Sequence, residues 1–363
     1  MTESPGTDTG AALRVGVIGV GMMGADHAQR LAGRVGNARL AAVVDPDRDR
    51  ARELAERFTD VAVFADPLEL ISDDDVDAVV IASPGFVHEE QVLACIAAGK
   101  HALCEKPLTM DADSSLRLVE AERAGGRPLV QVGFMRRFDP DYAAMHAMLG
   151  SGDLGRLLLV HNVHRNKTVP DTFRSEMIVR DSLVHEVDVC RWLFGEEITE
   201  ITVHSPAPTG SVADGVVDPQ VAVFRMAGGG MATTEVFVTC GVGYEVRCEA
   251  SAERGNATVG LGSGVFVRAA NRWGGTIADD FRVRFATAYD AEVQAWVDAS
   301  RRGEVVGATT WDGYAATAVC EAGLRSLETG VPVSVLLAAT DPAGLPTATP
   351  SARPDKSPAR SRP

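Results

Sequence analysis

Between residues 13 and 135, short apolar runs alternate with amphipathic segments. Short runs bounded by Gly, Asp or Pro predict buried strands, and apolar positions three and four apart predict helices. The expected strands are Leu13–Ile18, Arg39–Val44, Val61–Phe64, Asp77–Ala82, His101–Cys104 and Leu129–Gly133. The expected helices are Gly24–Leu31, Asp47–Phe58, Pro67–Ile71, Val87–Ala97 and Ala112–Ala124. Regular alternation of strand and helix predicts an α/β, Rossmann-type, doubly wound parallel sheet with helices on both faces.

After Phe138 the pattern changes to longer β-rich stretches. The expected strands are Arg156–Asn166, Ile198–His204, Val221–Met226, Met231–Cys240, Glu245–Ser251 and Asn256–Val259, with a hairpin turn at 228–230. The expected helices are Asp141–Leu149, Ser182–Phe194, Tyr289–Arg301 and Trp311–Glu328. This region predicts an α+β domain with a large, mostly antiparallel open sheet.

The 363 residues suffice for two domains, which we expect at 13–135 and 136–336. Residues 1–12 and 337–363 contain few large apolar side chains, so we expect both tails to be disordered.

The net charge of -15 argues against a nucleic-acid partner or an anionic membrane. No apolar run approaches the roughly 18 residues of a membrane span, and the N-terminus lacks a signal-peptide core, so we expect a cytoplasmic protein. The six cysteines form no C-x-x-C pair, which indicates buried reduced thiols. Tetrahedral zinc needs three or four converging ligands, and we expect no metal site.

A glycine motif follows the first expected strand and opens the first expected helix: Gly19, Gly21, Met22, Met23 and Gly24. In this context the glycines allow a tight turn, close approach of the backbone to a pyrophosphate, and close packing of helix on strand. The motif therefore predicts a dinucleotide site at the helix N-terminus.

Asp45 closes the second expected strand, at the distance from the glycine motif that is typical of the acid contacting the adenine ribose. Its carboxylate would accept from the 2'-hydroxyl and repel a 2'-phosphate, which favours NAD over NADP. An ordinary turn at Asp45 is the alternative, and Arg48 or Arg50 could reach a phosphate.

Lys106 lies just beyond the fifth expected strand, between Glu105 and Pro107. Ligands bind at the carboxyl ends of strands in parallel sheets, so an ammonium there can hold a substrate hydroxyl and stabilise oxyanion character. A solvated surface lysine is the alternative.

Asp181, His185, Asp188 and Trp192 share one stripe if residues 182–194 are helical. A carboxylate one turn before a histidine can fix its tautomer, and the histidine can then accept an alcohol proton. A structural histidine is the alternative reading.

Together the glycine motif, the Glu105-Lys106-Pro107 element and the segment from Asp181 to His185 resemble the glucose-fructose oxidoreductase / inositol dehydrogenase / rhizopine-catabolism (Gfo/Idh/MocA) family. The resemblance spans about Leu13 to Val335 and is greatest to the inositol dehydrogenase members. It implies NAD-dependent oxidation of a ring hydroxyl of a cyclitol or sugar to a ketone.

The resemblance also implies roles for individual residues. Lys106, Asp181 and His185 would be the catalytic set and would contact the substrate. The other substrate hydroxyls would be held by Arg136, Asn166, Tyr244 and Tyr289. Besides the glycine motif and Asp45, the cofactor would contact Ser83, Pro84, His88, Glu105 and Lys106.

Other functions stay open at this point. Some family members are other sugar dehydrogenases, some cleave glycosides through transient oxidation by NAD, and some are regulators that respond to NAD without catalysis. The partners expected are a small polyol or sugar and further copies of the chain, as a homotetramer or homodimer, because one face of a large open sheet often packs on another subunit.

Overall fold

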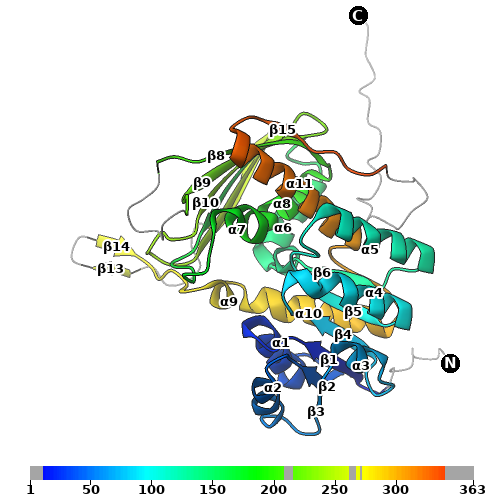
Figure 1. The fold of residues 1–363 in the computed structure, drawn as a ribbon. Coiled ribbons are helices and arrows are strands. Elements are labelled where there is room, and N and C mark those ends of the chain that lie inside the picture. The colour runs from blue at the N-terminus through cyan, green and yellow to red at the C-terminus, as the bar shows by residue number, and fades with distance from the viewer. Residues whose placement is uncertain (1–10, 208–215, 261–266, 270–271, 340–363) are drawn as a thin grey trace, which may run out of the picture.

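The protein consists of two parts, each built on its own sheet, which lie one above the other in Figure 1. The computed structural model describes residues 11–207, 216–260, 267–269 and 272–339. Most of both expected disordered tails lies outside the described residues.

The first sheet contains six parallel strands in the order β3-β2-β1-β4-β5-β6. Its strands are β1 (Leu13–Ile18), β2 (Ala38–Val44), β3 (Ala62–Phe64), β4 (Ala78–Ile81), β5 (His101–Glu105) and β6 (Val130–Gly133). The order reverses between β1 and β4, which creates the crevice where doubly wound sheets bind ligands. The predicted parallel sheet is therefore confirmed, with strand ends shifted by at most a residue or two (Figure 1).

Helices connect these strands. They are α1 (Met22–Gly33), α2 (Arg48–Ala55), α3 (Pro67–Ser72), the 3-10 turn η1 (Gly85–Val87), α4 (His88–Ala98) and α5 (Ala112–Gly125). Gly99 and Gly126 end α4 and α5 with φ of +68° and +71°. A side chain is strained in this left-handed conformation, which explains glycine at both helix ends.

The second sheet contains seven strands in the order β12-β11-β7-β10-β9-β8-β15. They are β7 (Leu157–Arg165), β8 (Ile198–His204), β9 (Gln220–Met226), β10 (Met231–Phe237), β11 (Glu245–Ala252), β12 (Gly255–Val259) and β15 (Val333–Ser334). β7 and β10 pair in parallel and the other neighbours are antiparallel, which confirms the mostly antiparallel sheet. The predicted turn at 228–230 joins β9 to β10, with Gly229 at φ +85°.

The remaining helices lie on one side of this sheet or, as with Ala286–Arg301, pack on the first sheet (Figure 1). They are the 3-10 turn η2 (Met135–Phe138), α6 (Pro140–Gly150), α7 (Ser175–Met177), η3 (Ile178–Leu183), α8 (Val184–Phe194), α9 (Phe281–Arg284), α10 (Ala286–Arg301) and α11 (Thr310–Thr329). The sequence pattern did not predict α9, nor the short hairpin of β13 (Val267–Ala269) and β14 (Arg272–Gly274).

The helix expected at Ser182–Phe194 differs from the prediction. Its start belongs to η3, which is a π-helix, and regular α-helix begins only at Val184. A π-helix bonds residue i to i+5, so side chains four apart no longer stack on one face. This change moves Asp181 relative to His185.

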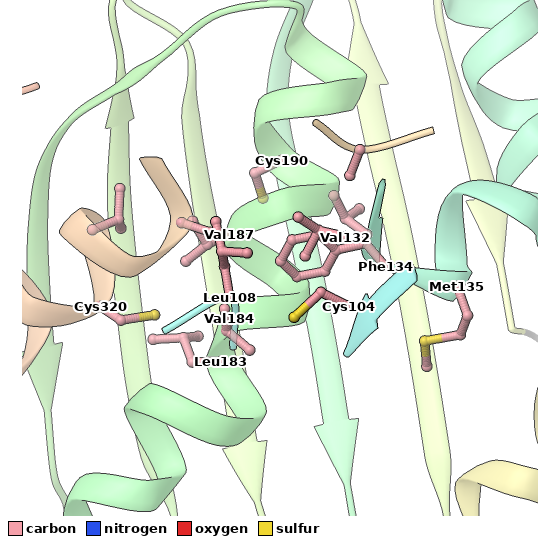
Figure 2. Close-up of a cluster of buried hydrophobic side chains, with 14 of the residues drawn as sticks. Cys104, Leu108, Val132, Phe134, Met135, Leu183, Val184, Val187, Cys190 and Cys320 are labelled. Atoms are coloured by element: carbon pink, nitrogen blue, oxygen red, sulfur yellow. The ribbon is translucent and has the colours of Figure 1, made fainter. Parts of the chain in front are cut away.

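An apolar cluster joins the two parts. Figure 2 shows Cys104 from β5, Val132 from β6 and Phe134 packing against Val184 and Val187 of α8. Each such side chain stabilises the fold by about 1.5–3 kcal/mol when fully buried. The cluster holds α8 against the carboxyl ends of β5 and β6, where Lys106 lies.

All six cysteines are free thiols. Within the residues described, no helix is both long and apolar enough to cross a bilayer.

Candidate active site

The glycine motif forms a tight loop between β1 and α1. Gly19 has φ +80°, and a Cβ on Gly24 would lie 1.7 Å from the Gly19 carbonyl oxygen. A Cβ on Gly21 would meet no atom within 4 Å, so the loop is open on that side. Helix α1 begins directly afterwards without a side-chain cap. Free N–H groups at a helix N-terminus attract phosphate, so the loop fits a dinucleotide.

Two further residues of the motif differ in exposure. Met22 is 60% exposed and Met23 is partly buried against the core. Their predicted contact with cofactor remains a prediction.

Asp45 is buried at the end of β2 and holds the glycine loop in place. Its Oδ2 accepts a hydrogen bond from the Val20 N–H at 2.8 Å, and its Oδ1 accepts from the Asp47 N–H at 2.9 Å. The Arg50 guanidinium also donates to Oδ1, at 2.9 Å. The contact of Asp45 with the ribose remains a prediction, and Arg50, the possible phosphate ligand, is paired with Asp45.

His88 faces the protein interior, not the crevice. Its Nδ1 lies 3.0 Å from the Pro107 carbonyl oxygen and its Nε2 lies 2.8 Å from the Ser83 carbonyl oxygen. The Ser83 hydroxyl donates to Gln91 Oε1 at 2.6 Å. His88 therefore fastens the loop after β4, which includes Pro84, to the loop that carries Lys106. Its predicted contact with cofactor, like those of Ser83 and Pro84, remains a prediction.

Lys106 is part-buried directly after β5. Its Nζ donates to the backbone carbonyl oxygen of Asp181 at 2.9 Å, which joins the two halves of the site. Burial lowers the pKa of the ammonium, while the carboxylates of Glu105 and Asp181 oppose that shift. The structure thus places a partly desolvated amine beside η3.

His185 lies on the first turn of α8 and is buried. Its ring contacts Phe134 and His164 at centroid distances of 6.2 Å and 6.3 Å. Burial holds the pKa of His185 well below its ordinary value, and Lys106, together with Arg136 and His164, lowers it further. The imidazole is therefore neutral near pH 7, as a proton acceptor must be. Its Nδ1 has no hydrogen-bond partner within the described residues.

Asp181 does not contact His185 in the way the helical spacing predicted. Its carboxylate forms a bidentate pair with Arg180, at 2.9 Å and 3.0 Å. The expected contact assumed an α-helical turn, whereas residues 178–183 are π-helical and present Asp181 at another angle. Asp181 is held near the site by its backbone, through Lys106.

The other members of the expected stripe also have partners. Arg137 donates to both oxygens of Asp188, at 2.6 Å and 3.0 Å. Trp192 stacks on His146 at 4.1 Å. Both contacts tie α8 to neighbouring elements.

Glu186 is the residue that sequence reasoning missed. It is fully buried, pairs with Arg136 through Oε1, and lies 3.1 Å from His164 Nδ1 through Oε2. Burial acts to raise the pKa of its carboxyl, but Arg136 and His164 hold it at about 2. The sequence did contain a signal for this residue. Glu186 lies between the apolar residues Val184 and Val187 on a helix that must bury its apolar face, and a buried carboxylate needs a cation as its partner.

The four residues expected to hold substrate hydroxyls come from different elements. Arg136 is 1% exposed, and its guanidinium is engaged by Glu186. Asn166 has a buried side-chain oxygen without a hydrogen-bond partner in the described part of the chain. Tyr244 packs edge-on against His164 at 5.7 Å, within the same cluster. Arg136 and Tyr244 therefore gather around His164 and Glu186.

Tyr289 lies toward α1, and the Phe281 ring packs against both Tyr289 and Tyr244. The Tyr289 ring packs edge-on against His27 at 6.1 Å, and the Arg30 guanidinium lies 5.0 Å from its centroid. The side chain is 3% exposed. Its role toward substrate remains a prediction, as do those of Arg136, Asn166 and Tyr244.

The described residues contain no group of three or more His, Cys, Asp or Glu side chains that could hold a metal ion.

Comparison with known proteins gives two family matches. Residues 13–134 match the model of the Gfo/Idh/MocA oxidoreductase family with an NAD-binding Rossmann fold. Residues 142–258 match the model of the Gfo/Idh/MocA C-terminal domain.

Similar proteins carry related names. An inositol 2-dehydrogenase of Mycolicibacterium gilvum is 52% identical over 90% of this chain and 94% of its own length. Inositol 2-dehydrogenase 4 of Saccharopolyspora erythraea is 51% identical over 90% of this chain and 96% of its own. The structure of myo-inositol dehydrogenase from Lactobacillus casei in complex with NAD(H) and myo-inositol superposes with a TM-score of 0.88, at 33% identity, covering 91% of this chain and 99% of that one.

Proposed function

The chain belongs to the Gfo/Idh/MocA oxidoreductase family, and from this premise we propose that it is an NAD-dependent inositol 2-dehydrogenase. It oxidises a ring hydroxyl of a cyclitol to the ketone, with myo-inositol and its 2-keto product as substrate and product. The main support for the proposal is the hydrogen bond from Lys106 to the Asp181 carbonyl oxygen. It brings Lys106 and the Asp181–His185 segment together at the crevice, beside an open glycine loop. Relatives at about half identity bear the same name.

NAD, when bound at the glycine loop, accepts the hydride from the carbinol carbon. The loop and the N-terminus of α1 hold its phosphates, and Asp45 holds the adenine ribose. This role of Asp45 is compatible with its bonds to Val20 and Asp47, because each carboxylate oxygen can accept more than one hydrogen bond.

His185 removes the proton of the reacting hydroxyl. Burial and neighbouring cations depress its pKa, which favours the neutral ring, and Nδ1 has no hydrogen-bond partner among the described residues, which supports this role. General base catalysis by a positioned histidine is worth about 10²- to 10⁴-fold in rate.

Lys106 holds the same oxygen. Its ammonium donates to the Asp181 carbonyl and has further N–H bonds to offer, since lysine carries three. A positive charge at this atom stabilises the alkoxide character that develops as the proton leaves. Asp181 contributes a carboxylate at the edge of the crevice, where it can accept from a second substrate hydroxyl.

Recognition of the remaining hydroxyls falls to Arg136, Asn166, Tyr244 and Tyr289. The buried oxygen of Asn166 has no partner in the described part of the chain, which supports this assignment, because a buried amide oxygen without a partner costs about 1–3 kcal/mol unless a ligand satisfies it.

A homotetramer or homodimer is also part of the proposal. The side chains of β7, β10 and β11 that point away from the helices are partly buried or exposed, which suits a face that packs on another copy. Light scattering of the purified protein tests this, and a monomer would contradict it.

The decisive test is NADH formation, followed by its absorbance, with myo-inositol, scyllo-inositol, chiro-inositol and glucose in parallel. We expect the highest kcat/KM with myo-inositol and NAD. Preference for glucose would assign another sugar specificity. Absence of turnover with every compound would overturn the proposal, and turnover of a glycoside without net NADH would replace it by glycoside cleavage.

A further inference from the structure

His27 and Glu105 form a buried pair next to Lys106. His27 lies on α1, shortly after the glycine loop, and its side chain has no exposed surface. Its Nε2 lies 2.7 Å from Oε1 of Glu105, the last residue of β5. The other carboxylate oxygen accepts from the Lys106 backbone N–H at 3.3 Å. Two side chains thus connect the helix behind the cofactor loop to the lysine in the crevice.

The walls around Glu105 come from three other elements. A Cβ on Gly133 of β6 would lie 3.2 Å from Glu105 Oε2, so the glycine leaves just enough room for the carboxylate. Helix α10 supplies Tyr289 and Glu292, and α1 supplies His27. The groups that face the Glu105 carboxylate from β6, α10 and α1 are buried, so water screens it little on these sides.

The two neighbouring acids differ in charge. Burial raises the pKa of Glu292 well above its ordinary value, and neither of its oxygens has a hydrogen-bond partner in the described structure. Burial is the largest influence on the pKa of Glu105 and acts to raise it, but His27 and Lys106 together offset this effect, His27 more strongly, and the net shift is downward. The pKa values of the two acids are thus shifted in opposite directions, and the ionised form is favoured at Glu105, which has His27 and Lys106 as partners.

Lys106 is affected by this charge. The Glu105 and Asp181 carboxylates raise the pKa of the ammonium against burial, Glu186 assists them, and Arg136 opposes them. The Asp181 carboxylate is shared with Arg180 and the Glu186 carboxylate with Arg136 and His164. Glu105 is the anion next to Lys106 in the chain, and His27 is its only hydrogen-bonded side-chain partner among the described residues.

We propose that His27 is a positioning residue for the dehydrogenase reaction, which acts through Glu105 to hold Lys106 in place and positively charged. For the role of Lys106 the proposal rests on the function proposed above. The pair couples the helix that carries the cofactor loop to the group that holds the reacting oxygen.

The first test measures the charge of Lys106 without catalysis. The full-length protein and its Glu105→Gln and His27→Leu variants are labelled with acetic anhydride at a series of pH values, and modification of Lys106 is followed by mass spectrometry. Loss of the adjacent anion should shift the midpoint of labelling to lower pH by about one unit in Glu105→Gln. His27→Leu should shift it in the same direction by less. Glu122→Gln is the matched control, a buried acid whose bonds go to Leu129, Val130 and Thr310, and should leave it unchanged.

The second test measures turnover of myo-inositol. His27→Leu should lower kcat by about 10-fold, the equivalent of one hydrogen bond to a charged group, and shift the alkaline limb of the kcat profile to lower pH. His27→Gln retains a donor near the position of Nε2 and should recover most of kcat. A merely structural histidine would change the thermal midpoint in both variants without moving the alkaline limb.

Several outcomes would overturn the proposal. One is an unchanged labelling midpoint for Lys106 in Glu105→Gln; another is a His27→Leu variant with wild-type kcat and pH profile. If His27→Leu does not fold, the proposal is tested by the labelling midpoint of Lys106 in Glu105→Gln and by the kcat of His27→Gln. Failure of the wild-type protein to oxidise any cyclitol would overturn the proposed function instead, and labelling would still test the pair.

Discussion

The glycine loop at residues 19–24 contains no ionisable side chain, whereas the segment around His185 is crowded with them. The loop can adopt its tight conformation only because its glycines lack side chains: a Cβ on Gly24 would overlap the Gly19 carbonyl. Around His185, geometry depends on buried charges from several elements: Lys106 after β5, Arg136 in η2, and Glu186 on α8. The cofactor half of the site is therefore sensitive to volume, and the proton-transfer half to charge.

The largest loss of activity is expected from replacing His185, the proposed base. Replacing His185 with Ala removes the proposed base and should lower kcat by about 10²- to 10⁴-fold. NAD binding, measured by fluorescence titration, should stay close to wild type because the loop is untouched. Turnover at the wild-type rate would show that another group takes the proton.

Volume should matter most in the loop. Gly24→Ala forces a methyl group to within 1.7 Å of the Gly19 oxygen, so the loop must move, and we expect NAD affinity to fall about 100-fold. Gly33→Ala, at the other end of α1, is the matched control because a Cβ there meets no atom within 4 Å. Equal affinities in the two variants would contradict a loop shaped by close packing.

The Asp181→Asn variant tests whether the Asp181 carboxylate orients His185 or only pairs with Arg180 near the substrate. If Asp181 oriented His185 as in a catalytic triad, the amide would lower kcat by about 10⁴-fold. In the structure the carboxylate pairs with Arg180, and we expect a loss of about 10-fold, from weaker substrate binding. Steady-state kinetics with myo-inositol distinguish the two, and a loss near 10⁴-fold would restore the triad.

The smallest expected effect is on the pH dependence of kcat/KM. Protonated His185 cannot act as a base, so kcat/KM should fall as pH drops through the pKa of this histidine in the free enzyme. Burial and the nearby cations lower that pKa, which places the acid limb below the ordinary value of about 6.5. A kcat/KM profile with its acid midpoint at or above 6.5 would show that the charges around His185 do not act as described.

Much of the cofactor half could be predicted from the sequence because its determinants are local. A strand followed by the glycine motif and a helix places Gly19, Gly21 and Gly24 without knowledge of distant contacts. Lys106 could be placed at a strand end for the same reason, from the apolar run that precedes it. Its bond to the Asp181 carbonyl, however, joins residues that no local pattern relates.

The proton-transfer half was predicted less well. The heptad-like spacing correctly predicted a helix that carries His185, but it could not reveal that residues 178–183 are π-helical. Arg136 was expected at the site, but its grouping with Glu186 and His164 was missed because the three residues are far apart in the chain. The inward orientation of His88 was missed for the same reason, since its partners lie on two other loops.

By itself the sequence determined the two sheets, the glycine loop, the positions of Lys106 and His185 in their elements, and the family. Apolar periodicity and backbone sterics act over a few residues, and these features follow from them. Tertiary structure alone decided which charges meet: His27 with Glu105, Glu186 with Arg136, and Asp181 with Arg180. A buried charge must find a counter-charge wherever packing brings one, and packing depends on the whole chain.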